Sequence, residues 1–279
     1  MESASSSPIT HAAADASAIS YEAFLREHAN QPMSTMRYEL GQETVWVKCA
    51  NTSNPSSHYR LLKALAVIMR APVLQPVPNP GGAQTIATEV RRLRNFAAKG
   101  LRAPTVLAAT EQAFLMRHLG QRDQEAPTLS QSIERAMEHG PQATLQQWQR
   151  GLEGLALVHA QGECLSQAAA RNMVCCPDGV IGFIDFEDDP AGTLPLPVCH
   201  ARDALNYAQS TALFLLQAHA LEQAKPLWRA FVAQLSAPAR QVLQDSIARM
   251  TWARFLPKSR KLGRDTQRVR AAYSLLGEP

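Results

Sequence analysis

Two oxygen-bearing side chains flank a short apolar hairpin in the second half of the chain. Residues 173–176 and 180–184 are apolar runs joined by a Pro-Asp-Gly turn at 177–179. Asn172 precedes the first run and Asp185 follows the second. Antiparallel pairing would bring both side chains to one end of the hairpin. An amide beside a carboxylate suits Mg²⁺, which takes a few protein oxygens and leaves its other positions to waters and phosphates.

A lysine and a glutamate in the first half of the chain lie on a predicted strand and on a predicted helix. Residues 36–48 alternate around Gly41 and include the β-forming Val-Trp-Val run, so they predict a hairpin that ends in Lys48. Residues 88–98 predict a helix on which Glu89 shares a face with apolar side chains. The glutamate therefore points toward the core side of its helix.

The elements that must position these residues change in type along the chain. Strand-like segments at 105–107 and 113–116 follow the first helix, and the composition changes at 117–120. Beyond that point a helix carries an apolar stripe from Leu145 to Leu155, and another long helix is expected over 198–223. Strands first and helices later predict an α+β chain. We expect a disordered tail at 1–20, a small β-rich lobe at 21–118 and a larger helical lobe at 119–279.

The composition sets limits on where the protein works. The chain has 279 residues, of which 46% are hydrophobic and 19% charged, which is typical of a globular protein. Its first 20 residues lack Lys and Arg, so they do not resemble a signal peptide. The five cysteines show no C-x-x-C spacing, which favours free thiols and a cytoplasmic protein. No apolar run approaches the roughly 20 residues that span a bilayer.

Basic residues crowd the C-terminal part of the chain, although the net charge is only +4. Seven Lys or Arg side chains lie between Arg254 and Arg270, opposed only by Asp265. The first interpretation is a solvated helix face. The second is contact with an anionic surface, which would place the protein peripherally on the inner membrane.

In their order and spacing, these segments resemble the protein-kinase superfamily. Val45-Trp46-Val47-Lys48 is similar to the strand whose lysine contacts nucleotide phosphates, and Glu89 to the helix glutamate that pairs with it. Asn172 and Asp185, the latter followed by Phe186, resemble the family's metal-binding pair. The resemblance implies a two-lobed kinase-like fold that binds ATP with Mg²⁺ or Mn²⁺.

Three further segments extend the resemblance, which covers about residues 36–220. Arg117 and His118 fall where the family's hinge holds adenine. Residues 157–162 are similar to the leucine-histidine signature that precedes the catalytic loop in bacterial lipopolysaccharide-core kinases and small-molecule phosphotransferases. Asp203 resembles the helix aspartate that braces that loop. His159 itself is expected to be a core histidine.

Two departures from the family pattern bear on activity. Gln167 stands five residues before Asn172, where the family carries its catalytic aspartate. An amide can accept a hydrogen bond from a hydroxyl but cannot take its proton. The first hairpin also lacks a G-x-G-x-x-G loop, because it holds only Gly41.

Three functions follow from these observations. The first is a phosphotransferase acting on a lipopolysaccharide sugar or another hydroxyl. The second is a pseudokinase that binds nucleotide and serves a protein partner as a regulatory or scaffolding module. The third is an interaction protein that works through the basic segment from Arg254 to Arg270.

Overall fold

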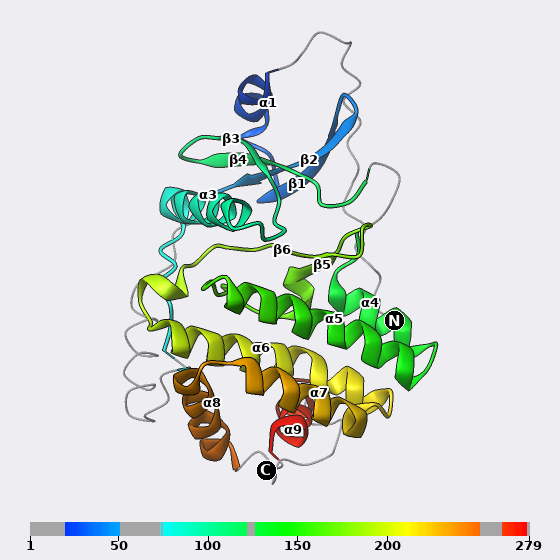
Figure 1. The fold of residues 1–279 in the computed structure, drawn as a ribbon. Coiled ribbons are helices and arrows are strands. Elements are labelled where there is room, and N and C mark those ends of the chain that lie inside the picture. The colour runs from blue at the N-terminus through cyan, green and yellow to red at the C-terminus, as the bar shows by residue number, and fades with distance from the viewer. Residues whose placement is uncertain (1–19, 51–72, 74, 122–125, 252–263, 278–279) are drawn as a thin grey trace.

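A computed structural model describes residues 20–50, 73, 75–121, 126–251 and 264–277 of the chain. Figure 1 shows a small sheet with two helices above a larger group of helices, and a two-stranded hairpin between the two parts. The predicted α+β architecture with a β-rich N-lobe and a helical C-lobe is confirmed. The expected tail at 1–19 lies outside the described residues, whereas Ser20 caps the first helix through its hydroxyl.

The N-lobe is built on a four-stranded antiparallel sheet in the order β1-β2-β4-β3. The strands are β1 Thr35–Leu40, β2 Glu43–Cys49, β3 Val106–Ala109 and β4 Ala113–Arg117. One face buries Tyr38, Val45 and Leu115 against Phe24 and Leu25 of helix α1 (Tyr21–His28). This helix lies in the range assigned to the N-lobe, but the sequence pattern did not predict it.

Helix α3 (Gly82–Ala98) packs beside the sheet and carries Glu89. It starts before the predicted residue 88, because Thr85 and Ile86 extend its buried face. Gly81 has φ 76°, a left-handed conformation that glycine adopts without strain, and it turns the chain into the helix. The expected helix end before Gly100 is confirmed, and the buried stripe continues through Leu93 and Phe96.

The C-lobe is a stack of helices around one apolar core (Figure 1). Its helices are α4 Leu129–Met137, α5 Pro141–Ala160, α6 Leu196–Gln217, α7 Leu221–Gln234, α8 Ala237–Arg249 and α9 Arg264–Leu276. Trp148 of α5 is fully buried and donates its indole N–H to Thr211 of α6 at 2.9 Å. The two helices approach closely where Gly151 faces Tyr207, and any side chain at position 151 would meet the tyrosine hydroxyl.

The long helix predicted over 198–223 is in fact two helices. Helix α6 ends at Gln217 and α7 starts at Leu221. His219 between them has φ 57°. A residue in this left-handed conformation ends a helix, so the chain turns there. A helical composition alone does not reveal such a turn when no glycine marks it.

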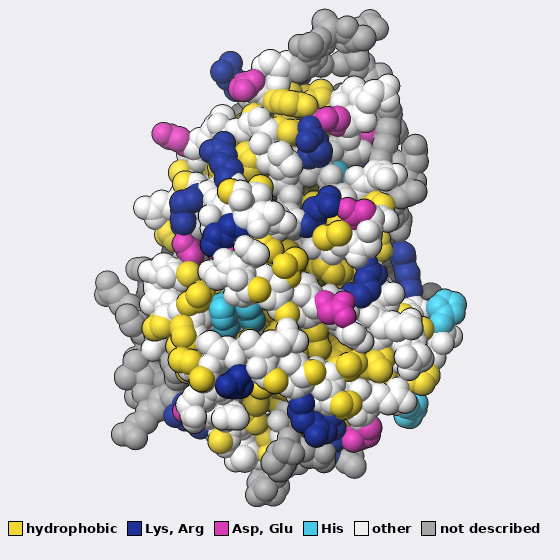
Figure 2. Space-filling view, in the orientation of Figure 1, with side chains coloured by type: hydrophobic (Ala, Val, Ile, Leu, Met, Phe, Trp, Pro, Cys, Tyr) yellow, Lys and Arg dark blue, Asp and Glu magenta, His cyan; other side chains and the backbone are white. Residues whose placement is uncertain are grey.

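Charged side chains are dispersed over the face shown in Figure 2, where lysines and arginines form small groups, several beside acidic side chains. None of the described helices is long and apolar enough to span a membrane. Residues 252–263, which include much of the basic segment interpreted as a solvated helix face or as a contact with an anionic surface, lie outside the described residues.

Candidate active site

Lys48 and Glu89 meet between β2 and α3. The Lys48 ammonium lies 2.8 Å from the Glu89 carboxylate, and both residues are buried. Lys48 follows the apolar Val45-Trp46-Val47 run near the end of its strand, while Glu89 lies on the buried face of its helix. A charge buried in this way requires a partner, because desolvation is costly for an isolated ion. The predicted ion pair is therefore present, and it joins the sheet to the helix.

Lys48 also faces two acidic residues of the segment that follows the hairpin. Its ammonium lies 3.6 Å from Asp185 and 3.0 Å from Glu187. Burial opposes the charged form of Lys48, but the neighbouring carboxylates outweigh it and raise the pKa of the ammonium. Burial raises the pKa of Glu89, against the pull of Lys48. Three carboxylates around one ammonium leave an excess of negative charge that a cation would offset.

Glu89 also fixes the backbone next to Asp185. The backbone N–H of Phe186 donates to the Glu89 carboxylate at 3.3 Å, and the Phe186 ring packs on Phe96 of the same helix with centroids 4.5 Å apart. Asp185 has φ 70°, a conformation that few non-glycine residues adopt. Such backbone strain persists where the surroundings fix it, and it is typical of functional sites.

Asn172 and Asp185 lie side by side, as the hairpin predicts. Strands β5 (Met173–Cys175) and β6 (Ile181–Phe183) pair with Met173 opposite Phe183. The Asn172 side-chain amide donates to the Asp185 carboxylate at 3.2 Å and to the backbone oxygen of Gln167 at 3.2 Å. No group of three His, Cys, Asp or Glu residues in the described part of the chain is arranged to hold a metal ion. A metal here would rest on this amide and carboxylate together with ligand oxygens, which suits Mg²⁺.

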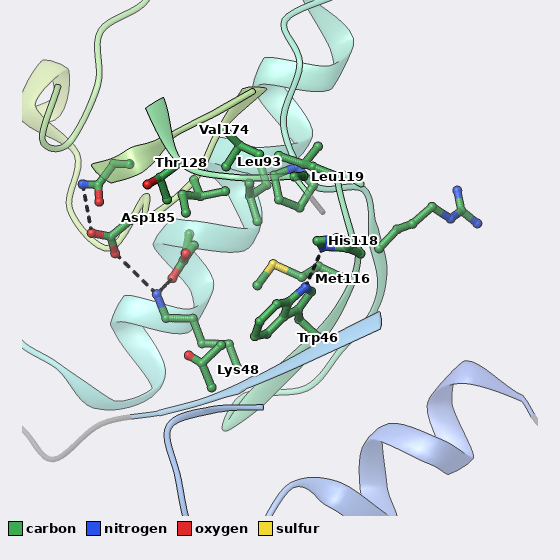
Figure 3. A pocket seen from close by; sticks show the side chains of 16 residues that line it. Trp46, Lys48, Leu93, Met116, His118, Leu119, Thr128, Val174 and Asp185 are labelled. Carbon is green, nitrogen blue, oxygen red and sulfur yellow. Dashed lines mark hydrogen bonds and ion pairs between the residues drawn. The ribbon is translucent and has the colours of Figure 1, made fainter. Parts of the chain in front are cut away.

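A cavity of about 460 Å³ connects these groups to an apolar end. Figure 3 shows Lys48 and Asp185 at one end and Trp46, Met116 and His118 at the other. The Trp46 indole N–H donates to Nδ1 of His118 at 3.0 Å. Burial lowers the pKa of His118, which keeps the ring neutral and able to accept this bond. Leu93, Val174 and Ile184 complete the apolar walls.

The two hinge residues contribute to the cavity in different ways. The His118 backbone N–H is already bonded to Thr44 within the N-lobe, and its ring holds Trp46. Arg117 lines the cavity, while its guanidinium pairs with Glu43 at 2.9 Å and is 45% exposed.

The comparison with known families agrees with this arrangement. Residues 83–186 match the RIO domain, an atypical protein-kinase-like family. The matched segment begins inside α3, ends at Phe186 and includes Glu89, Gln167, Asn172 and Asp185. The chain has a protein-kinase-like fold. No curated protein matches it.

The match refines the predicted resemblance. It supports a kinase-like, ATP-binding domain but not the lipopolysaccharide-core branch of the superfamily. Lys48 lies in β2, outside the matched segment, so its place in the kinase-like site rests on its ion pair with Glu89.

The loop that carries Gln167 is braced from the C-lobe of the kinase-like domain. Asp203 of α6 accepts the backbone N–H of Leu165 at 3.0 Å and contacts His159 at 3.2 Å. His159 in turn stacks on His200 with ring centroids 4.0 Å apart. Burial and the neighbouring imidazole lower the pKa of His200 to about 4. The expected bracing contact of Asp203 is thus present, and His159 is packed against the core as predicted.

Arg92 joins α3 to the same loop, and the sequence did not predict this role. Its guanidinium donates to the Ser166 hydroxyl at 2.6 Å, to the backbone oxygen of Asp188 at 2.8 Å and to the backbone oxygen of Cys164. It also lies 5.0 Å from the centre of the Phe186 ring. An arginine three residues after Glu89, on the buried face of the helix, was the available signal.

Gln167 does not line the cavity that holds Lys48 and Asp185. Its side-chain oxygen accepts a hydrogen bond from Arg171 at 2.6 Å, whereas its backbone oxygen holds Asn172. The amide thus sits on the border between the Asn172–Asp185 pair and the surface beyond it. All five cysteines are free thiols, as expected.

Proposed function

We propose that this chain binds ATP with a divalent metal ion in the cleft between its lobes and transfers the γ-phosphoryl group to a hydroxyl of a small acceptor. The observation that carries the proposal is the single cavity that joins the buried Lys48–Glu89 pair to Asn172 and Asp185. Phosphoryl transfer depends mainly on positioning and electrostatic stabilisation, which these groups supply. The match to the RIO domain supports the ATP-binding part of this proposal.

Each residue of the cavity has a definite part in this proposal. Lys48 would contact the phosphates, held in place by Glu89, and Asn172 and Asp185 would hold the metal. The metal, when bound, neutralises charge on the phosphates. The excess of carboxylate around Lys48 is consistent with a bound cation.

The apolar end of the cavity would hold the adenine ring. Met116 and Val174 offer aliphatic surface, and Trp46 is fixed in orientation by its bond to His118. Arg117 and His118 would border the ring, with His118 acting through its ring, because its backbone N–H is bonded to Thr44.

The transfer itself would proceed without a strong general base. The acceptor oxygen forms a bond to the γ-phosphorus while the bond from that phosphorus to the bridging oxygen breaks, and the electron pair leaves with ADP. Gln167 can orient the hydroxyl, and the proton passes to a phosphoryl oxygen or to water. A general base usually contributes about 10²–10⁴-fold, so its loss slows the reaction without abolishing it.

Neither acidic neighbour is a convincing substitute base. Glu187 pairs with Lys48 at 3.0 Å. Asp188 is partly buried, and one of its carboxylate oxygens is shielded from solvent. Gln167 therefore also favours a second candidate, a pseudokinase that binds nucleotide and serves a protein partner. A lipopolysaccharide sugar remains one acceptor of the proposed class, implied only by the resemblance of residues 157–162.

Thermal unfolding tests the proposal directly. Purified wild type and Asp185→Asn are compared with ATP alone, Mg²⁺ or Mn²⁺ alone, and both together. We expect stabilisation by ATP with metal in the wild type and a loss of the metal-dependent part in Asp185→Asn, because a ligand that binds only the folded state raises its stability. A melting temperature that does not respond to millimolar ATP and metal would refute both candidates. ATP consumption with sugar and other hydroxyl acceptors then separates transfer from binding alone.

A further inference from the structure

A second cavity lies on the other side of the loop that carries Gln167. Its volume is about 370 Å³, and it is lined by residues of α4, the loop, α6 and α9. Residues 167–172 form the border between the two cavities, since Asn172 lines the first while Gln167 and Arg171 line the second. A molecule in the second cavity would therefore lie next to the position from which the proposed phosphoryl transfer takes place.

The second cavity is basic. Arg171, Arg202 and Arg268 line it from three different elements, and the described lining residues include no Asp or Glu. Asn206 and Gln209 of α6 add amide groups. Like charges gathered around one cavity repel each other, so such a site favours an anion.

Arg171 and Arg202 are held in position by neutral groups. Arg171 donates to the side-chain oxygen of Gln167 at 2.6 Å, and Arg202 donates to the backbone oxygen of Gln75 at 2.7 Å. These bonds orient the guanidinium groups without cancelling their charge, although Arg202 also lies close enough to Asp188 to influence that carboxyl. A guanidinium is a planar fork of N–H donors that matches the oxygens of a phosphate.

We propose that this cavity binds the phosphate group of the acceptor, and that the acceptor is a soluble phosphomonoester carrying a free hydroxyl. This inference rests on the proposed phosphoryl transfer and names its substrate class. A cavity of about 370 Å³ is at the small end of ligand sites, which typically occupy about 300–1,000 Å³. With its phosphate bound among the arginines, a small acceptor would extend to Gln167, whose amide would orient the hydroxyl.

The inference also gives the basic C-terminal segment a function. Arg268 lies within the segment from Arg254 to Arg270 and reaches the cavity from α9, which packs on α6. Its charge would then serve recognition of a small anion rather than a membrane surface. Substitution of Arg268 would distinguish binding of a small anion from binding to a membrane, because a membrane contact does not require a lined cavity beside Gln167.

Glycerol 3-phosphate is the probe, because it is a small phosphomonoester with free hydroxyls, and glycerol at matched ionic strength is its control. We expect it to stabilise the wild type in thermal unfolding, whereas glycerol does not. In Arg268→Gln the concentration for half-maximal stabilisation should rise at least about tenfold, since a charge-assisted bond to phosphate is lost. Arg171→Gln, at an exposed residue that poses little risk to folding, should show a similar loss. Arg229→Gln, an exposed arginine of α7 outside the cavity, should behave as the wild type.

Lys48→Met separates this inference from the proposed function. We expect this variant to lose the response to ATP with metal and to retain the response to glycerol 3-phosphate. If ATP with metal does not stabilise the wild type, the proposed function is refuted, but the anion site is not. The inference is overturned if glycerol 3-phosphate does not stabilise the wild type, if Arg268→Gln and Arg171→Gln respond as the wild type does, or if the protein binds only vesicles of phosphatidylcholine that contain phosphatidic acid.

Discussion

The two sides of the Gln167 loop differ in charge and in the functional groups that line them. On the side of the first cavity, Glu89, Asp185 and Glu187 surround Lys48, and Asn172 donates a hydrogen bond to Asp185. On the side of the second cavity, arginines line the wall and an amide takes the place of a base. In the proposed function, the groups expected to hold nucleotide and metal are therefore present, whereas the residue expected to activate the acceptor is replaced by an amide.

The largest effect is expected from restoring a carboxylate on the altered side. Gln167→Asp should raise ATP-dependent transfer by about 10²-fold, toward the lower end of the range for a general base. Arg171 would pair with the new carboxylate and lower its basicity. Gln167→Asp combined with Arg171→Gln should therefore gain more at a saturating acceptor concentration, where the weaker acceptor binding expected of Arg171→Gln does not limit the rate. Initial rates of ADP formation with a hydroxyl acceptor measure both. Unchanged rates in both variants would show that proton removal does not limit the reaction.

Arg92 joins helix α3 to the loop that separates the two cavities. Arg92→Met should lower the free energy of unfolding by about 3 kcal/mol, because it leaves several buried acceptors of the loop without a donor. The neighbouring Arg91 is 62% exposed and pairs with Asp189, so Arg91→Met should cost less than about 1 kcal/mol. Urea unfolding of both variants provides a matched comparison. Equal losses would show that the buried contacts of Arg92 add no stability.

Asp188 links stability to pH in the absence of metal. Burial raises the pKa of its carboxyl to about 6 in the folded protein, above the unfolded value. This carboxyl therefore favours folding when protonated, and that contribution is lost as the pH rises from about 4 to 6. Asp188→Asn should be more stable than the wild type at pH 7, on the order of 1 to 2 kcal/mol, and similar at pH 4. Urea unfolding across this pH range would contradict the assignment if the difference did not grow with pH.

The smallest effect is expected at the exposed edge of the first cavity. Arg117→Gln removes an ion pair with Glu43 that is largely exposed, and such pairs contribute about 0–1 kcal/mol. The affinity for ATP with metal should stay within about twofold. A larger loss would show that the Arg117 side chain contacts the nucleotide, as its position at the hinge implied.

The sequence predicted the elements whose patterns are local. The hairpin between Asn172 and Asp185 follows from two apolar runs and a Pro-Asp-Gly turn, and its pairing alone brings both side chains together. The Lys48–Glu89 ion pair was expected from the resemblance to the protein-kinase superfamily, whereas periodicity alone placed Lys48 at the end of a hairpin and Glu89 on the apolar face of its helix. The hairpin prediction rests on periodicity and turn chemistry, which a single sequence contains.

Other features depend on contacts between distant segments, and the sequence alone did not reveal them. The sequence does not show the partners of Arg92, because they lie at 164–166 and meet the arginine only when α3 packs against that segment. The cavity that holds Arg171, Arg202 and Arg268 is formed by segments far apart in the chain. The turn at His219 was missed because its left-handed backbone is set by packing rather than by a glycine. Tertiary context, and not local pattern, decides all three.

Calorimetric titration of ATP with Mg²⁺ into the wild type and Lys48→Met tests the central claim most directly. The account predicts saturable binding to the wild type that requires the metal, and an affinity at least about a hundredfold weaker in Lys48→Met, because the phosphates lose their buried cation. Circular dichroism confirms that the variant is folded. Absence of binding to the wild type, or equal affinity in the two proteins, would contradict the assignment of this cavity as a nucleotide site.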